Sequence, residues 1–235
     1  MILGRESHVH AACFDEIDRA VSALTDRVVC FNAHAFPDRI PAGAVVYNLE
    51  NVPHQIAPEW FDGFEVWDFS RRSVEFAAKG GRAWKHVPVG YHSSMKRFDR
   101  CAPREREIDV VFAGAMNARR AAVLEGFSRR GLRVVHVPSA LYGAGRDRIL
   151  ARAKLALNML FYEGGVFPAL RVAHLVANGV PVLSERCEEG WDFVETCGYD
   201  ELIERAEELA REDELDLRAD RALRIFEARP MMAPS

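Results

Sequence analysis

The sequence has no marked excess of either charge and no long apolar run. Its 235 residues include 31 Lys and Arg against 35 Asp and Glu, for a net charge of −4. This balance creates no global field for nucleic acid or an anionic membrane, so any phosphate recognition must be local. No apolar stretch approaches the roughly 20 residues that span a bilayer, and the start, MILGRESHVH, lacks a signal-peptide core. We therefore expect a cytoplasmic protein without a membrane span or a nucleic-acid partner.

Cysteine is scarce, and the common site fingerprints are missing. The five cysteines form no CxxC pair, and no Cys/His cluster has zinc spacing, so we expect reduced, mostly buried thiols and no bound metal. The motifs GxGxxG and GxxxxGK[ST] are also absent, which excludes the usual dinucleotide and P-loop fingerprints.

Short β-branched runs alternate with helical patterns along the whole chain, which is typical of βαβ units and parallel sheets. We predict strands near 27–32, 44–48, 65–68, 85–89, 108–113, 132–137, 155–159 and 180–184, with helices near 11–24, 71–78, 119–130, 146–152 and 168–178. A polar segment at 91–107, broken by Pro103, is a linker candidate. The predicted fold class is α/β, with Rossmann-like domains in residues 1–100 and 108–212 and a C-terminal helix and tail in 213–235.

Polar residues follow several predicted strands. Ligands of open parallel sheets bind at the carboxyl ends of the strands, and this rule selects Glu50, Asp68, Gly114 and Asn117. Asn117 opens a helix whose first turn contains Arg119, and free amides with a positive dipole end suit a phosphate. The alternative is that Asn117 is an ordinary cap and that the arginines are surface charges.

The segment 158–185 carries a stronger signal. Glu163 precedes the flexible pair Gly164 and Gly165, and Pro168 stands where a helix should begin. Two glycines let a ligand approach the backbone closely, and Arg171 adds a cation that can bind a diphosphate with two hydrogen bonds. The segment therefore predicts a diphosphate site.

This segment resembles the donor-binding region of GT-B glycosyltransferases, because Glu163, Gly164, Pro168 and the later GVPV fit that register. Arg171 stands where the common retaining form has a second glutamate. The pattern RVAHLVANG is similar to a bacterial branch related to spore-maturation glycosyltransferases, although His174 replaces the glutamate often found there. The motifs VVYNLENV, VWDFS and VPVGY resemble strand-end motifs of the same branch.

The resemblance implies two Rossmann-like domains facing a cleft, the first on the acceptor side and the second binding the sugar nucleotide. The activity implied is transfer of a sugar, as in hexosyltransferases, from a UDP- or GDP-sugar to an unknown acceptor, without metal or other cofactor. The diphosphate would be held by Gly114, Arg119, Gly164, Gly165 and Arg171. Glu163 would contact sugar or ribose hydroxyls, and Tyr142 would contact the base.

The acceptor base should come from the first half. A histidine that is neutral near pH 7 can take a proton from a hydroxyl, so His10 is the first choice and Glu50 the second, with Asp68 orienting its neighbours. His34, His54, His86 and His136 show no metal spacing and are expected to be structural. A module that binds a sugar nucleotide without turnover is the alternative. The first half is short, so either it is a minimal domain or another chain completes it, which leaves a homo-oligomer open.

Overall fold

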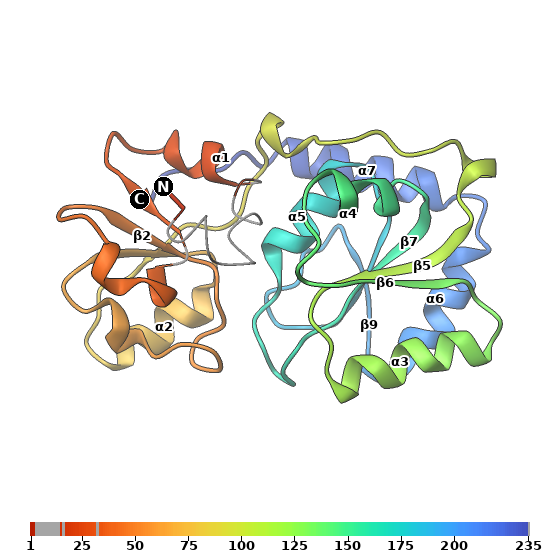
Figure 1. Cartoon of the computed structure of the whole chain (residues 1–235), viewed down its shortest axis with the longest axis horizontal. Helices are drawn as coiled ribbons and strands as arrows, with labels where there is room; N and C mark the ends of the chain where they lie inside the picture. Colours follow the sequence, from red (N-terminus) through yellow and green to blue (C-terminus); the bar gives the residue numbers. More distant parts are fainter. Residues whose placement is uncertain (3–14, 16, 32, 235) are drawn as a thin grey trace.

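The computed structural model describes residues 1–2, 15, 17–31 and 33–234, and it contains two parallel sheets (Figure 1). The N-terminal sheet has the order β1-β2-β3-β4, with β1 (Val29–Cys30), β2 (Val45–Asn48), β3 (Glu65–Asp68) and β4 (Lys85–His86). The C-terminal sheet has the order β6-β5-β7-β8-β9, with β5 (Ile108–Ala113), β6 (Val134–Val137), β7 (Ala153–Asn158), β8 (Val182–Glu185) and β9 (Glu195–Cys197). We call these parts the N-terminal and C-terminal halves.

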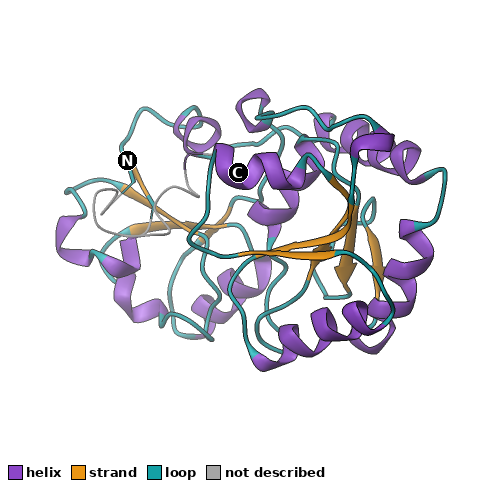
Figure 2. Ribbon diagram, turned by 45° about the vertical axis from the view of Figure 1, so that its right-hand side comes forward, coloured by secondary structure: helices purple, strands orange, loops and turns teal. Residues whose placement is uncertain are grey.

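The helices are α1 (Asp18–Ser22), α2 (Arg71–Lys79), α3 (Ala118–Arg129), α4 (Ala144–Leu150), α5 (Ala169–Ala177), α6 (Leu202–Ala210) and α7 (Leu215–Glu227). In the C-terminal half, α4, α5 and α7 lie on one side of the sheet, and α3 and α6 lie on the other (Figures 1 and 2). The helix predicted over 11–24 is described only at its C-terminal end. Strand β9 was not predicted, because its three residues, Glu-Thr-Cys, show no apolar run.

Burial explains why these strands read as continuous apolar runs. All four residues of β2 are buried, as are five of the six in β7, since helices cover both faces of a parallel sheet. Helix starts are fixed by side-chain caps, because the Ser70 hydroxyl accepts from the Ser73 amide and the Asn117 side chain accepts from the Arg120 amide. Both caps lie at carboxyl ends of strands, so two helix N-termini point toward the junction of the halves.

The chain crosses between the halves twice. Residues 87–107 lead from β4 to β5, and the Asn178 side-chain oxygen accepts from the amides of Arg97 and Phe98. After α7 the chain returns to the N-terminal half, where the Tyr91 amide donates to the Arg229 carbonyl at 2.8 Å and Tyr91 forms a bridge with Pro230. Contacts from distant parts of the sequence therefore hold the halves together.

An aromatic cluster supports this return. The Phe226 ring of α7 lies 5.6 Å from Tyr91 of the N-terminal half and 5.0 Å from Trp191 of the C-terminal half. Trp191 also stacks on Phe193, with ring centroids 5.2 Å apart. Phe226 is thus a buried side chain shared by both halves.

Candidate functional site

Two adjoining cavities lie where the halves meet, at the carboxyl ends of the strands. They measure ≈ 300 and ≈ 310 Å³ and share Leu49, Glu50, Gln55, Phe69, Ala115, Pro168 and Arg171. The Tyr142 lobe is lined in addition by Gly114, Ser139, Tyr142, Arg146 and His174, among others. The Tyr162 lobe is lined in addition by Asn51, Arg120, Phe161, Tyr162 and Gly165. Together they have the size of a small-ligand site.

Two arginines make the Tyr162 lobe electropositive. Arg120 is buried and donates to the backbone carbonyls of Ala115, Met159 and Leu160. Burial and the nearby charges of Arg171 and Arg119 lower the pKa of Arg120 to about 9. Removal of the guanidinium from water is the larger cause of this shift, and the neighbouring positive charges add to it.

Arg171 is the second of these cations. Its guanidinium donates to the Asn158 side-chain oxygen at 3.3 Å and lies 5.7 Å from the centre of the Phe112 ring. Burial lowers its pKa, and within the described residues no carboxylate forms an ion pair with it. A cation that is partly removed from water and has no carboxylate partner is stabilised by a bound anion.

The inner wall of the Tyr142 lobe carries a charged network. The Asp147 carboxylate accepts from Arg146 at 3.0 Å and also lies 3.0 Å from the His174 ring nitrogen. Burial raises the pKa of Asp147, but the hydrogen bond and charge of His174 and the charge of Arg146 outweigh it and lower the pKa. The Arg146 guanidinium also lies 5.6 Å from the centre of the Tyr142 ring, which fixes that ring at the wall.

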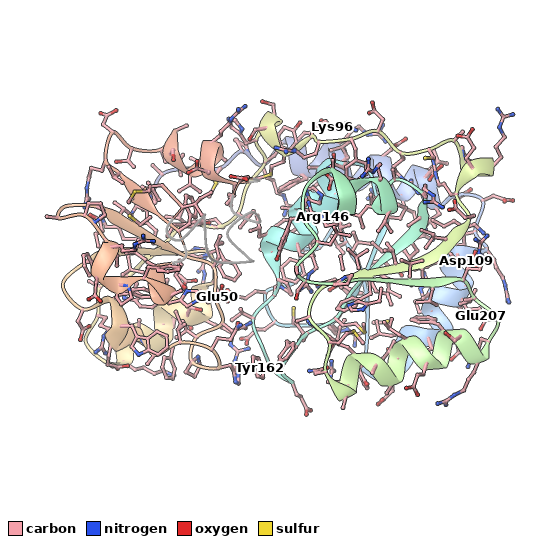
Figure 3. All side chains as sticks on the ribbon, viewed as in Figure 1. Glu50, Lys96, Asp109, Arg146, Tyr162 and Glu207 are labelled. Carbon is pink, nitrogen blue, oxygen red and sulfur yellow. The ribbon has the colours of Figure 1, made fainter. Side chains whose placement is uncertain are left out.

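Loops of the two halves meet over the Tyr162 lobe. The Asn51 side-chain oxygen accepts from the Val166 amide at 2.9 Å, and Arg72 donates to the Gly164 carbonyl at 2.8 Å. The rings of His54 and Tyr162 stack at 5.1 Å. In Figure 3, Glu50 and Tyr162 lie at the junction of the halves. Access to this lobe therefore depends on the positions of the loop that carries Asn51 and the loop that carries Gly164 and Val166.

The two predicted acidic residues have different environments. Glu50 lines both lobes, and burial raises its pKa. Asp68 is completely buried and accepts from the Asn48 side-chain amide at 2.6 Å and from the Ser70 amide at 2.7 Å. Burial raises the pKa of Asp68 to about 7. Glu50 can reach a ligand, whereas Asp68 orients Asn48 and the start of α2.

Asp68 should make stability depend on pH. Its pKa is about 7 in the folded chain against an ordinary 3.8, so the folded state binds more protons between these values. Stability should fall by about 2 kcal/mol as the pH rises from about 5 to about 7. Asp68→Asn cannot titrate, so urea unfolding at both pH values should show a smaller pH-dependent loss in the variant. Parallel losses in the two proteins would contradict a raised Asp68 pKa.

The structure brings part of the predicted site together. Glu50, Gly114, Tyr142, Gly165 and Arg171 line the two lobes. Gly164 adjoins Gly165 and has a φ of +67°, which suits glycine. None of the other predicted residues in the described part of the chain lines either lobe.

Arg119 is held away from the lobes by an ion pair with Glu185 and lies over the Tyr199 ring. Asn117 caps α3 and donates to the Phe161 carbonyl at 2.8 Å, so it supports the site indirectly. Glu163 is exposed. His10 lies outside the described residues.

The sequence places Arg119 and Arg120 in the same first turn of α3, but it led us to assign the phosphate contact to Arg119 alone, whereas Arg120 lines the Tyr162 lobe. Arg120, Val123 and Phe127 share the buried face of α3, at the spacing expected for one helix face. That spacing could have identified Arg120, because a charged side chain is rarely buried unless it has a partner or a ligand. The network of Arg146 and Asp147 had no comparable signal, because its partner His174 lies on another helix.

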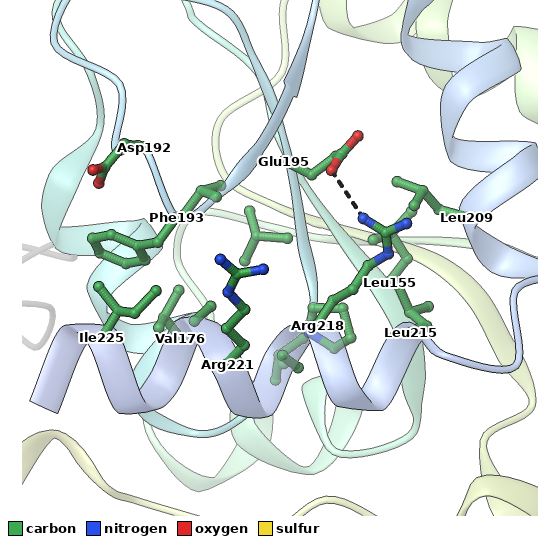
Figure 4. A pocket seen from close by; sticks show the side chains of 16 residues that line it. Leu155, Val176, Asp192, Phe193, Glu195, Leu209, Leu215, Arg218, Arg221 and Ile225 are labelled. Atoms are coloured by element: carbon green, nitrogen blue, oxygen red, sulfur yellow. Dashed lines mark hydrogen bonds and ion pairs between the residues drawn. The ribbon is translucent and has the colours of Figure 1, made fainter.

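A third groove, of ≈ 340 Å³, lies between α7 and β8–β9 (Figure 4). Arg218 and Arg221 extend from α7 across it, and Arg218 pairs with Glu195 and Glu212. Pro181 and Val182 place this groove at the amino end of β8. Since helix N-termini and strand-end loops converge at the opposite edge, the two lobes are the stronger candidate site.

One solved structure agrees with this architecture. No protein-family model matches the chain. The chain superposes on the crystal structure of TarM with a TM-score of 0.58 and 10% identity, covering 94% of this chain and 55% of TarM. The glycotransferase of kitacinnamycin superposes with a TM-score of only 0.38 and 13% identity, over 96% of this chain and 81% of that one.

Two sequence relatives come from Acanthamoeba polyphaga mimivirus. The uncharacterized protein L138 is 26% identical over 106 residues, which cover 42% of this chain and 12% of L138. The uncharacterized protein L140 is 22% identical over 131 residues, which cover 51% of this chain and 42% of L140. The chain thus spans about half or less of the length of TarM and of these relatives.

The two parallel-sheet halves and the likeness to TarM define a two-domain GT-B fold, and the predicted fold class is confirmed. Within the described residues, no helix combines the length and the apolar character that crossing a bilayer requires. In the same part of the chain, no group of three or more His, Cys, Asp or Glu residues could hold a metal ion.

Proposed function

We propose that this chain transfers a glycosyl group from a nucleoside diphosphate sugar to an acceptor hydroxyl. The observation that carries the proposal is the placement of Arg171, a half-buried cation without a carboxylate partner in the described residues, at the wall shared by both lobes. Arg120 adds positive charge to the Tyr162 lobe, and α3 and α5 begin beside it. These features favour a diphosphate in that lobe.

The Tyr142 lobe would then take the nucleoside. Tyr142 offers an aromatic face, and Arg146 and His174 offer polar groups at the same wall. The sugar would lie toward Glu50, which both lobes share. The leaving diphosphate would be stabilised by Arg171 and by backbone amides, so the reaction needs no divalent metal.

The alternative is a module that binds a sugar nucleotide without turnover. The two functions share the diphosphate site and differ only in whether the acceptor side is competent. Hydrolysis or transfer from UDP-glucose or GDP-mannose by the purified chain would exclude the alternative.

UDP or GDP should bind equally well with and without EDTA, because protein cations rather than a metal ion neutralise the diphosphate. Calorimetric titration of both nucleotides measures this directly. A ligand at about 100 times its dissociation constant should also add roughly 2.7 kcal/mol to the free energy of unfolding. Binding that disappears with EDTA would contradict metal independence, and no binding of either nucleotide would contradict the proposed function.

A further inference from the structure

A small pocket of ≈ 160 Å³ adjoins the Tyr142 lobe, with which it shares Phe69 and Ala169. Both halves contribute to it. Its remaining lining residues are His86, Pro88, Val89, Phe167, Glu189 and Trp191. Most of these are apolar, and three of the side chains in the wall are aromatic. The pocket therefore suits one ring more than an extended polar group.

The two polar side chains of this pocket, Glu189 and His86, differ in how many of their hydrogen-bonding atoms are already occupied. The Glu189 carboxylate accepts from the Ser70 hydroxyl at 2.5 Å and from the Arg71 amide at 2.7 Å. His86 uses one ring nitrogen, Nε2, which lies 3.2 Å from the Phe69 carbonyl. No described residue forms a hydrogen bond with the other nitrogen, Nδ1. Among the described residues, Nδ1 thus has no hydrogen-bond partner that would compete with a ligand of the pocket.

The Phe69 carbonyl fixes the tautomer of His86. A carbonyl oxygen only accepts, so Nε2 carries the proton and Nδ1 keeps its lone pair. Burial lowers the pKa of His86, which keeps the ring neutral near pH 7. The Phe69 hydrogen bond and the Glu189 charge oppose this effect, whereas the Arg71 charge reinforces it. A neutral imidazole with an open Nδ1 can accept a proton.

We propose that this pocket holds the acceptor and that His86 is the base that deprotonates it, the acceptor being an aromatic alcohol. This inference rests on the proposed function. The ring of a phenol would pack among Phe69, Phe167 and Trp191 and leave one hydroxyl to meet one open nitrogen. A sugar acceptor would bury several hydroxyls against side chains that offer them few hydrogen-bond partners.

The step balances without a further reactant. The acceptor oxygen forms a bond to the anomeric carbon as the bond from that carbon to the phosphate oxygen breaks. The acceptor proton moves to Nδ1 of His86, and the diphosphate leaves with the electron pair toward Arg171. Phe69, which lines this pocket and both lobes, stands at the boundary between acceptor and donor.

The first test uses ligand binding rather than turnover. In ¹⁵N-histidine NMR spectra, His86 should show an unprotonated Nδ1 near pH 7, and phenol should shift that signal. Anisole has the same ring without the hydroxyl, so it should shift the signal less. A protonated Nδ1, or a signal that responds equally to both compounds, would overturn the proposal.

The second test compares His86→Gln with His92→Gln, using UDP-glucose or GDP-mannose as donor and phenol as acceptor. His92 is the matched control, because its Nδ1 is already bonded to the Ser94 hydroxyl at 2.8 Å. His86→Gln should lower turnover by about 10² to 10⁴, with UDP affinity unchanged, and imidazole should partly restore the activity of His86→Ala. His92→Gln should match the unmodified chain.

The outcomes separate this inference from the proposed function. If UDP binds and sugar transfer occurs but His86→Gln keeps full activity while Glu50→Gln loses it, Glu50 is the base and His86 is not. If transfer proceeds to methyl glucoside and not to phenol, the acceptor class is wrong. If UDP fails to bind while phenol still shifts the His86 signal, the proposed diphosphate site is contradicted, whereas binding of a phenol beside His86 is supported.

Discussion

Replacing Arg171 by alanine should weaken UDP binding at least tenfold. The half-buried side chain lines both lobes, and a hydrogen bond to a charged group contributes about 1.5 to 3 kcal/mol. Because the described residues offer Arg171 no carboxylate, the bound diphosphate would be its principal counter-charge. Calorimetric titration of UDP into both proteins measures the loss.

Arg129→Ala is the matched control for Arg171. Arg129 also lies on a helix of the C-terminal half, but it is 76% exposed and pairs with Glu125 on the surface of α3. Its replacement should leave UDP affinity unchanged. Equal affinities of the two variants would remove Arg171 from the binding site and leave it as a structural cation beside Asn158.

Phe226→Ala should cost about 3 to 5 kcal/mol in the free energy of unfolding, the usual range for a buried phenylalanine. The ring is buried and contacts Tyr91 from the N-terminal half and Trp191 from the C-terminal half, so its loss leaves a cavity between them. Urea unfolding followed by tryptophan fluorescence and by circular dichroism measures the change.

Leu217→Ala, on the same helix, is the control for Phe226→Ala. Leu217 is 63% exposed, so its replacement should change stability by no more than about 0.5 kcal/mol. If both substitutions cost the same, the aromatic cluster does not join the halves. Separate unfolding transitions in Phe226→Ala would instead show that the halves lose cooperativity when the cluster is removed.

The sequence was informative wherever chemistry is local. Alternating β-branched and helical patterns predicted both parallel sheets, and the strand-end rule selected Glu50 and Gly114, which line the lobes. The proline and glycines of the segment 158–185 placed Arg171 at the start of a helix, where the structure has it. Each of these inferences depended on residues a few positions apart.

The sequence was less informative where a side chain depends on a distant partner. Arg119 had the same local signal as Arg171, but Glu185, far along the chain, pairs with it and holds it away from the lobes. His86 looked structural, because nothing near it in the sequence reveals that Phe167 and Trp191 complete a pocket around it. Such pairings are set by tertiary packing, which periodicity does not report.

The return of the chain after α7 has a consequence for biosynthesis. Strands β1–β4 leave the ribosome long before Phe226 and Pro230, yet Tyr91 completes its contacts only with that later segment. Until then, the surface around Tyr91 stays uncovered. Exposed apolar surface on a nascent chain attracts chaperones and favours aggregation. A nascent chain stalled before Phe226 should therefore bind chaperones more strongly than one released after Met231.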